Sequence, residues 1–189
     1  MDRNLQEKIL AESPVIPAIK DYQGLERCIE SESNMVFILF GDICSISDIV
    51  TKVKNSGKYA IVHIDLIEGL SSKDVAVDFI VKYTKADGII STKNNLIRYA
   101  KSKGLITIQR FFLIDSLAFS NLSKHASYED ADLIEILPGV MPNVISKVVR
   151  ISKVPVIAGG LITEKEDIIS ALSAGATAVS TTNSKVWFL

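Results

Sequence analysis

Short apolar runs rich in valine and isoleucine alternate with amphipathic stretches along nearly the whole chain. The runs are strand-sized and apolar on both faces, which indicates buried parallel strands. We expect strands at 15–19, 35–40, 59–65, 88–92, 105–111, 132–137, 154–160 and 176–182. The amphipathic stretches between them predict helices at 22–32, 47–55, 73–83, 94–102, 115–125, 143–151 and 164–174.

The spacing of the strand ends favours one α/β architecture over another. Strands recur at intervals of about two dozen residues, which suits successive βα units joined by right-handed crossovers. Eight strands close a barrel. An open doubly wound sheet is the alternative, but here the glycine-rich turn follows the seventh strand rather than the first. We therefore expect a compact single-domain (β/α)8 TIM-type barrel over 1–189, with a helical lead-in at 1–13 and a truncated final helix at 184–189.

Composition limits the class of protein. The chain has 189 residues, of which 48% are hydrophobic, enough for one well-buried core. Its net charge is −1, so any anion site must be local. No apolar stretch is long enough for a membrane span and no secretory signal is visible, so a cytoplasmic protein is expected. Cys28 and Cys44 lack metal-binding spacing, and no metal site is expected.

The turn after the seventh strand is the clearest candidate for a ligand site. Gly159 and Gly160 allow a close backbone approach and a positive φ, and a helix is expected to start just beyond them. Amides beside a helix N-terminus suit a phosphate. The next strand ends in Thr181 and Thr182, and the loops after the last two strands form the usual phosphate site of such barrels. A plain turn without a ligand is the alternative.

Further polar side chains lie at predicted strand ends: Asp65, Ser91, Thr92, Gln109, Arg110 and Glu135. Asp65 and Glu135 are interpreted either as an acid/base pair across the barrel mouth, or as groups that bind polyol hydroxyls or pair with Arg110. His63 shares the parity of Asp65 and is expected to be a hydrogen-bonded core residue. Because no strand-end lysine is placed for a Schiff base, the residues alone indicate a phosphate-binding barrel without a clear catalytic constellation.

Two groups of basic residues are candidates for contact with RNA. The first lies on and just beyond the helix at 94–102, and comprises Lys93, Arg98, Lys101 and Lys103. The second comprises Lys147, Arg150 and Lys153. Such groups are usually solvated helix faces, and the sequence has no RNP, KH or zinc pattern. Composition alone therefore does not predict RNA binding.

Six blocks of sequence carry a resemblance to a known family. They are HIDLIEGL at 63–70, DGIIST at 87–92, IQRFFLIDS at 108–116, EILPG at 135–139, PVIAGGLI at 155–162 and GATAVSTT at 175–182. In this order the blocks resemble the glycerol uptake operon antiterminator regulatory protein family, from about 15 to 187. Thr182 stands where the family usually has serine, and Val186 where it usually has leucine; Thr182 keeps the hydroxyl.

The resemblance implies a compact barrel that does no known chemistry. It implies a protein that senses glycerol 3-phosphate, uses no cofactor, and acts on the leader mRNA of glycerol-catabolism genes so that transcription passes a terminator. An isomerase or lyase acting on a small phosphorylated metabolite is the alternative. Self-association as a homo-oligomer is left open.

With that ligand, position at the strand ends assigns roles as follows. The phosphate would be held by Gly159, Gly160, Thr181 and Thr182. The glycerol hydroxyls would be read or enclosed by Asp65, Gln109, Arg110 and Glu135. The RNA would contact the first basic group, which is chosen for its charge and not for its position at strand ends: Lys93, Arg98, Lys101 and Lys103.

Overall fold

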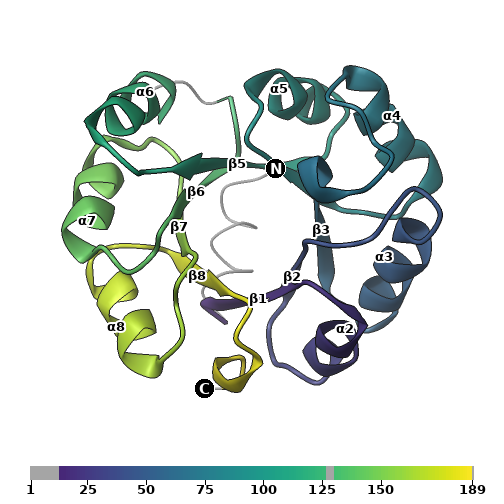
Figure 1. Cartoon of the computed structure of the whole chain (residues 1–189), viewed down its shortest axis with the longest axis horizontal. Helices are drawn as coiled ribbons and strands as arrows, with labels where there is room; N and C mark the ends of the chain where they lie inside the picture. The colour runs from purple at the N-terminus through teal and green to yellow at the C-terminus, as the bar shows by residue number, and fades with distance from the viewer. Residues whose placement is uncertain (1–12, 127–129, 189) are drawn as a thin grey trace.

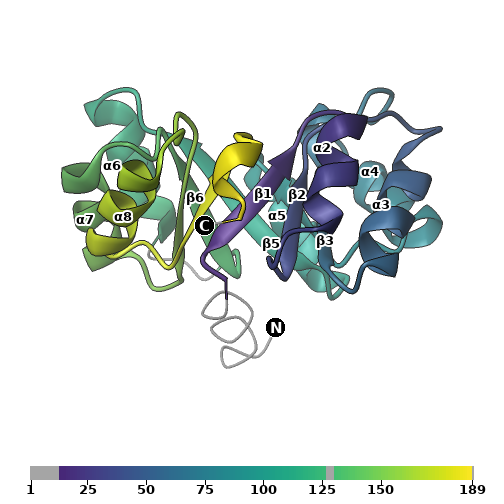
Figure 2. The ribbon, with the colours of Figure 1, turned by 90° about the horizontal axis from the view of Figure 1, so that it is seen from below.

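A computed structural model describes residues 13–126 and 130–188, which form a closed barrel of eight parallel strands. The strands pair in chain order, and the last pairs with the first. Figure 1 shows the ring of strands with helices around its outside, and Figure 2 shows the barrel from the side. The predicted (β/α)8 barrel is confirmed. Except for Ser13, the helical lead-in expected at 1–13 lies outside the described residues.

The elements follow the predicted order with small shifts at their ends. The strands are β1 (Val15–Ile19), β2 (Met35–Ile38), β3 (Tyr59–His63), β4 (Gly88–Ser91), β5 (Ile106–Phe112), β6 (Leu133–Leu137), β7 (Val156–Gly159) and β8 (Ala178–Thr181). The helices are α2 (Tyr22–Ile29), α3 (Ile46–Asn55), α4 (Asp74–Tyr83), α5 (Asn94–Ser102), α6 (Ser116–Ala126), α7 (Pro142–Ile151) and α8 (Lys165–Ser173). Two 3-10 turns are η1 (Ile64–Leu66) and η2 (Ser184–Val186). The stub expected at 184–189 is thus a 3-10 turn rather than an α-helix.

The strands bury side chains on both faces, as their sequence predicts. One cluster fills the barrel interior and includes Ile16, Phe37, Ile61, Ile108 and Ile157. A larger cluster lies between the outside of the barrel and the helices. Because successive strand residues point to opposite faces, each strand supplies both clusters. Burying one such side chain stabilises the fold by roughly 1.5–3 kcal/mol. The barrel interior is thus a packed core and not a channel, and polar groups lie at the mouth.

Two aspartates join neighbouring strands near the start of β4 and β6. Asp87 accepts a hydrogen bond of 2.8 Å from the backbone N of Ala60 and pairs with Lys54 Nζ at 2.7 Å. Asp132 accepts from both the backbone N and Oγ1 of Thr107 at 2.9 Å. Each aspartate precedes its own strand and bonds to the preceding one, so it fixes the pairing of β3 with β4 and of β5 with β6.

Gly88 opens β4 at a point where no side chain fits, and this yields a stability prediction. A Cβ there would overlap the carbonyl oxygen of Ile106 and lie 2.9 Å from its carbonyl carbon. Because both atoms belong to the paired backbone of β5, the strands would have to separate. We expect Gly88→Ala to lower the free energy of unfolding by roughly 1–3 kcal/mol, measured by urea denaturation.

The matched control is Gly57→Asn in the turn after α3. Gly57 has a φ of 80°, and a Cβ there would have no atom within 4 Å. Asparagine adopts left-handed conformations more readily than most residues, so the urea midpoint should stay close to that of the unaltered protein. Equal midpoints for the two variants would contradict the proposed crowding at Gly88.

Candidate functional site

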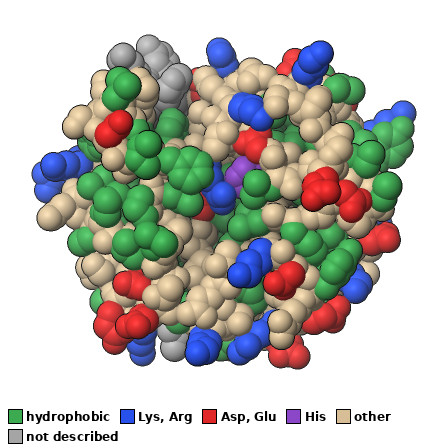
Figure 3. Space-filling view, in the orientation of Figure 1, with side chains coloured by type: hydrophobic (Ala, Val, Ile, Leu, Met, Phe, Trp, Pro, Cys, Tyr) green, Lys and Arg blue, Asp and Glu red, His purple; other side chains and the backbone are tan. Residues whose placement is uncertain are grey.

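A buried carboxylate organises the C-terminal end of the barrel. Glu135 on β6 has no exposed surface; it accepts a hydrogen bond of 2.6 Å from Arg110 Nε on β5 and one of 2.5 Å from Ser180 Oγ on β8. Gly159 on β7 leaves the space they occupy, because a Cβ there would come within 2.5 Å of Glu135 Oε1 and Ser180 Oγ. We call Arg110, Glu135, Gly159 and Ser180 the Glu135 network. Figure 3 shows a hollow at this end, with acidic, basic and histidine atoms near its centre.

The Glu135 network leaves donors on Arg110 for another partner. Both carboxylate oxygens of Glu135 are bonded, whereas among the described residues Arg110 donates only through Nε. A guanidinium has five N–H donors in a planar fork that matches oxygen-rich ligands. Arg110 is buried, with 8% of its surface exposed. The barrel mouth thus holds a cation that is fixed in place by Glu135 and still has hydrogen-bonding capacity.

His63 ends β3 and adds an unsatisfied polar atom. Its side chain is 3% exposed, and Nδ1 is buried without a hydrogen-bond partner among the described residues. Burial, followed by the positive charge of Arg110, lowers the pKa of His63 to about 4, so the imidazole is neutral at pH 7. From the sequence, His63 is expected to be a hydrogen-bonded core residue. The structure shows instead a neutral ring with a free position, which suits a hydroxyl group of a ligand.

The Asp65 carboxylate is hydrogen-bonded to the loop after β4 and does not form a pair with Glu135 across the mouth. It accepts hydrogen bonds from Ser91 Oγ at 2.9 Å and from the backbone N of Thr92 at 2.8 Å, and it pairs with Lys93 Nζ at 3.4 Å. Burial acts to raise the pKa of Asp65, but these hydrogen bonds outweigh it and hold the pKa below its ordinary value. The 3-10 turn that starts at Ile64 ends the strand alternation from which its inward direction was inferred. The acid/base pair considered from sequence therefore has no support in this geometry.

Two other predicted ligand residues face away from the mouth. Ile108 lies in the interior cluster, and strand alternation places Arg110 on the same face and Gln109 on the opposite one. On β8, Ala178 lies in that cluster, so Thr181 faces outward. Thr181 Oγ1 donates to the Ile162 carbonyl at 2.6 Å. Gln109 and Thr181 thus support the wall of the barrel.

The β7–α8 turn contains two consecutive left-handed residues. Gly160 has a φ of 75° and Leu161 a φ of 61°. For leucine this conformation costs about 1–2 kcal/mol. The nearby start of α8 already holds negative charge, because Asp167 accepts from the backbone N of Thr163 at 2.9 Å and of Glu164 at 3.1 Å. The amides of Thr163 and Glu164 are thus already engaged by a carboxylate of the same helix.

Thr182 lines a small cavity between the end of β8 and α2. The cavity has a volume of about 160 Å³, and its lining includes Ser184 and the cations Lys20 and Arg27. Asp21 also lines it, and its carboxylate caps α2 through the backbone N of Gly24 at 2.7 Å. Two hydroxyls and a surplus of positive charge suit a phosphoryl group. The sequence alone did not indicate Lys20 and Arg27 as ligand residues. They lie near Thr182 only because β1 pairs with β8 when the barrel closes.

The loops after β7 and β8 are also joined to each other. Asn183 Nδ2 donates to the Thr163 carbonyl at 2.7 Å, and the Asn183 side chain caps η2 by accepting from the backbone N of Lys185 at 3.1 Å. Sequence reasoning did not single out Asn183 or Ser180, although both lie in or beside the hydroxyl-rich end of β8. Gly160 and Thr182 therefore lie on adjacent loops that are hydrogen-bonded to each other, while Gly159 belongs to the Glu135 network.

The two basic groups differ in how far their charge is compensated. In the first group, three cations pair with carboxylates: Lys93 with Asp65, Lys101 with Asp132 and Lys103 with Asp78. In the second group, Lys147, Arg150 and Lys153 are exposed, and none forms an ion pair within the described residues. The second group thus presents more uncompensated positive charge.

Within residues 13–126 and 130–188, no three or more His, Cys, Asp or Glu side chains lie together so that they could hold a metal ion. No helix in these two ranges is both long and apolar enough to cross a membrane.

Comparison with known proteins identifies relatives along nearly the whole chain. An Escherichia coli K12 protein described as uncharacterized, YgcP, is 46% identical over 181 residues, which are 96% of this chain and 95% of that protein. The crystal structure of a glycerol uptake operon antiterminator regulatory protein from Listeria monocytogenes is 34% identical, with a TM-score of 0.88 and coverage of 93% of this chain and 95% of that one. A related Thermotoga maritima structure is 30% identical, with a TM-score of 0.81 and coverage of 92% and 96%.

A family model described as glycerol-3-phosphate responsive antiterminator matches residues 15–187. This range includes all eight strands and the whole Glu135 network. The resemblance carried by the six sequence blocks is thereby confirmed, and the chain belongs to the glycerol-3-phosphate responsive antiterminator family.

Proposed function

We propose that this chain is an RNA-binding transcription antiterminator that responds to glycerol 3-phosphate. Binding of that ligand would strengthen its hold on the leader mRNA of glycerol-catabolism genes, so that transcription passes a terminator. The observation that carries the proposal is the family match over residues 15–187. The polar mouth of the barrel supplies chemistry that fits such a ligand.

The phosphoryl group would bind where the β7 and β8 loops meet. Gly160 offers a turn without a side chain, Thr182 offers a hydroxyl, and Lys20 and Arg27 supply positive charge in the adjoining cavity. A phosphate dianion is favoured by convergent N–H and O–H donors and by nearby cations. Of the phosphate-binding residues predicted from the sequence, Gly160 and Thr182 are retained in this proposal, and Lys20 and Arg27 are added. Gly159 and Thr181 would support the site without contacting the phosphate.

The glycerol hydroxyls would bind Arg110 and His63. Arg110 has unused guanidinium N–H groups, and the neutral His63 ring has an unpartnered nitrogen. Glu135 would act by positioning Arg110, since both of its oxygens are already bonded. Asp65 and Gln109 would have no direct contact with the ligand. The proposed polyol site is thus smaller than the one expected from strand ends alone.

Coupling between ligand and RNA requires two states of the protein. A ligand shifts such an equilibrium only by its difference in affinity for the two states. A tenfold preference corresponds to about 1.4 kcal/mol. The turn at Gly160 and Leu161 is a candidate for the element that changes, because Leu161 holds a costly backbone conformation while its side chain is exposed.

An enzyme of phosphorylated metabolites is the competing proposal, and the geometry favours it less. Proton transfer needs a side chain that can reach the substrate proton. Asp65 and Glu135, the carboxylates considered for this role, are both fully engaged in hydrogen bonds within the protein. Binding without turnover is therefore the function that these residues support.

The proposed function is tested by a filter-binding titration with leader RNA of the glycerol 3-phosphate dehydrogenase message. We expect the dissociation constant to fall at least tenfold when glycerol 3-phosphate is added, and to remain unchanged with glycerol or inorganic phosphate alone. The same samples are assayed for consumption of the ligand. Absence of RNA binding in every condition would refute the antiterminator proposal, and ligand turnover would favour the enzyme.

The phosphate turn is tested by Gly160→Ala with isothermal titration calorimetry. A Cβ at Gly160 would lie 3.0 Å from Leu137 Cδ2, and alanine would be strained at the φ of 75° that Gly160 adopts. We expect affinity for glycerol 3-phosphate to fall at least tenfold. Gly104→Ala is the matched control, because Gly104 has a φ of 82° and a Cβ there would have no atom within 4 Å. Equal affinities of the two variants would remove the turn from the site.

The role of His63 is tested by His63→Phe. Phenylalanine fills the space but has no ring nitrogen, so a hydrogen bond to the ligand is lost. We expect affinity for glycerol 3-phosphate to fall roughly tenfold, which corresponds to one hydrogen bond of about 1.4 kcal/mol. Stability without ligand should stay level or rise, because the change removes a buried unpaired nitrogen. A loss of stability equal to the loss of affinity would point to a purely structural histidine.

The pH dependence of stability provides an independent check on the same variant. The pKa of His63 is about 4 in the folded state and about 6.5 in the unfolded state. The stability from keeping the ring neutral is thus fully present above pH 6.5 and is lost as pH falls toward 4. Between pH 7 and 4.5 this amounts to about 2 kcal/mol. The decrease in unfolding free energy over that interval should be smaller by this amount in His63→Phe.

A further inference from the structure

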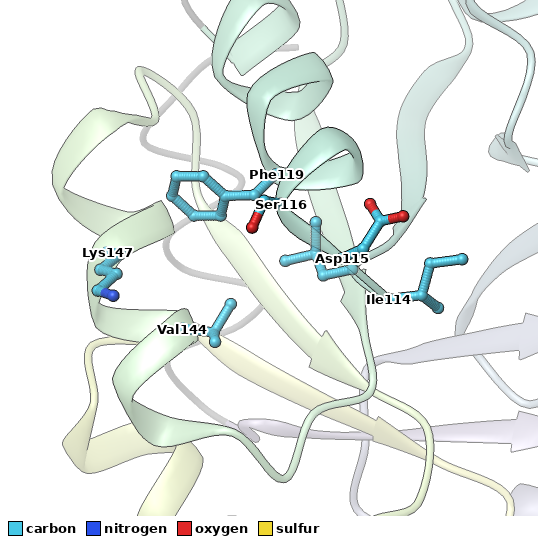
Figure 4. A pocket seen from close by; sticks show the side chains of 7 residues that line it. Ile114, Asp115, Ser116, Phe119, Val144 and Lys147 are labelled. Carbon is cyan, nitrogen blue, oxygen red and sulfur yellow. The ribbon is translucent and has the colours of Figure 1, made fainter.

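A groove runs between the start of α6 and α7, outside the barrel mouth. It has a volume of about 380 Å³ and is lined by Leu113, Ile114, Phe119 and Val144, with Lys147 at its edge. Figure 4 shows Phe119 on the side of the groove where Val144 and Lys147 lie, whereas the side chain of Ile114, in the β5–α6 loop, extends away from them. Ile114 is 82% exposed, the largest exposure among the large apolar side chains described. We call this feature the α6–α7 groove.

Positive charge continues from the groove along α7. Lys147 and Arg150 are three residues apart and therefore lie on one face of the helix, and Lys153 follows just beyond its end. Within the described residues none of the three is paired with a carboxylate. The acid of the groove, Asp115, is engaged locally, since Oδ1 accepts from the backbone N of Ala118 at 2.7 Å. Its charge faces the positive end of the α6 dipole.

We propose that the α6–α7 groove, with Lys147, Arg150 and Lys153, is the surface that binds single-stranded RNA. The bases would lie against Phe119 and Val144 in the groove, and the phosphates would follow the cations. This pairing of an apolar or aromatic platform with a basic track is how proteins hold single strands. The inference rests on the proposed antiterminator function and names the face that contacts the message.

The same surface is connected directly to the proposed ligand site. Strand β5 carries Arg110 into the mouth and, within a few residues, leads to Ile114 in the groove. The backbone N of Leu113 donates to the Leu137 carbonyl at 2.7 Å, so this segment is also attached to the end of β6. A shift of Arg110 toward a ligand would therefore move the groove wall. On and beside α5, by contrast, three of the four cations predicted for RNA contact are paired with carboxylates.

The test compares two double variants with the same change in net charge. One is Lys147→Glu/Arg150→Glu on α7; the other is Lys82→Glu/Lys85→Glu, which alters two exposed cations at and just beyond the end of α4. Fluorescence anisotropy with the labelled leader transcript is measured with saturating glycerol 3-phosphate. We expect at least a tenfold loss of affinity for the α7 variant and less than threefold for the control. The salt slope of the α7 variant should fall by about 1.4, for two lost single-strand phosphate contacts.

The outcomes separate failure of this inference from failure of the proposed function. If the unaltered protein binds RNA and the α7 variant binds equally well, or if the control loses as much, the RNA face lies elsewhere and only this inference is overturned. If the unaltered protein binds no RNA, the proposed function fails and the inference fails with it. Circular dichroism and ligand calorimetry on both variants establish that the fold and the ligand site are intact.

Crosslinking locates the RNA without relying on a mutation. A leader transcript containing 4-thiouridine is irradiated on the unaltered protein and the linked peptides are identified. Links within 113–119 or 144–153 support the inference, and links confined to 93–103 overturn it. A second copy of the chain is the competing occupant. If Ile114→Asp converts a dimer to a monomer in sedimentation equilibrium without changing RNA affinity, the groove is a protein interface and the inference is wrong.

Discussion

The buried carboxylate of Glu135 constrains the barrel more than any other single group. A charge removed from water costs several kcal/mol unless its partners are well placed. Here Arg110 on β5 and Ser180 on β8 satisfy both oxygens, and β7 must carry a glycine at 159 to leave room. One carboxylate therefore fixes the relative positions of four consecutive strands. The stability of the closed barrel and the composition of its mouth follow from the same requirement.

This constraint separates groups that support the site from groups that remain free to bind. Glu135 and Asp65 have their oxygens occupied by neighbouring strands and loops. Arg110 retains donors and His63 retains an unpartnered nitrogen. A mouth whose acids are structural and whose free groups are a cation and a neutral imidazole is suited to recognising an anionic polyol. It is poorly suited to moving protons.

The sequence predicts the barrel well because the fold is specified locally. Each apolar run needs only its own β-branched residues to indicate a buried strand, and their spacing determines the order. The candidate site was harder to predict, because its contacts depend on the register between strands that are distant in the sequence. The bond from Arg110 to Glu135 follows from their pairing across β5 and β6. The 3-10 turn after His63 redirected Asp65, and only tertiary packing brings Lys101 to Asp132.

Hydrogen bonds join neighbouring loops at the mouth of the barrel. The loops after β2 and β3 are bonded to each other, with Ile43 N donating to the Glu68 carbonyl at 3.0 Å and Glu68 N to the Gly41 carbonyl at 3.0 Å. The loops after β7 and β8 are likewise joined, because Asn183 Nδ2 donates to the Thr163 carbonyl at 2.7 Å. Ile114, Leu161 and Leu117, the most exposed large apolar side chains among the described residues, all follow β5 or β7, which carry Arg110 and Gly159 of the Glu135 network. Because a ligand can shift only elements that differ between two states, the ligand proposed at Arg110 would have to act through the loops after these strands to change the surface outside the mouth.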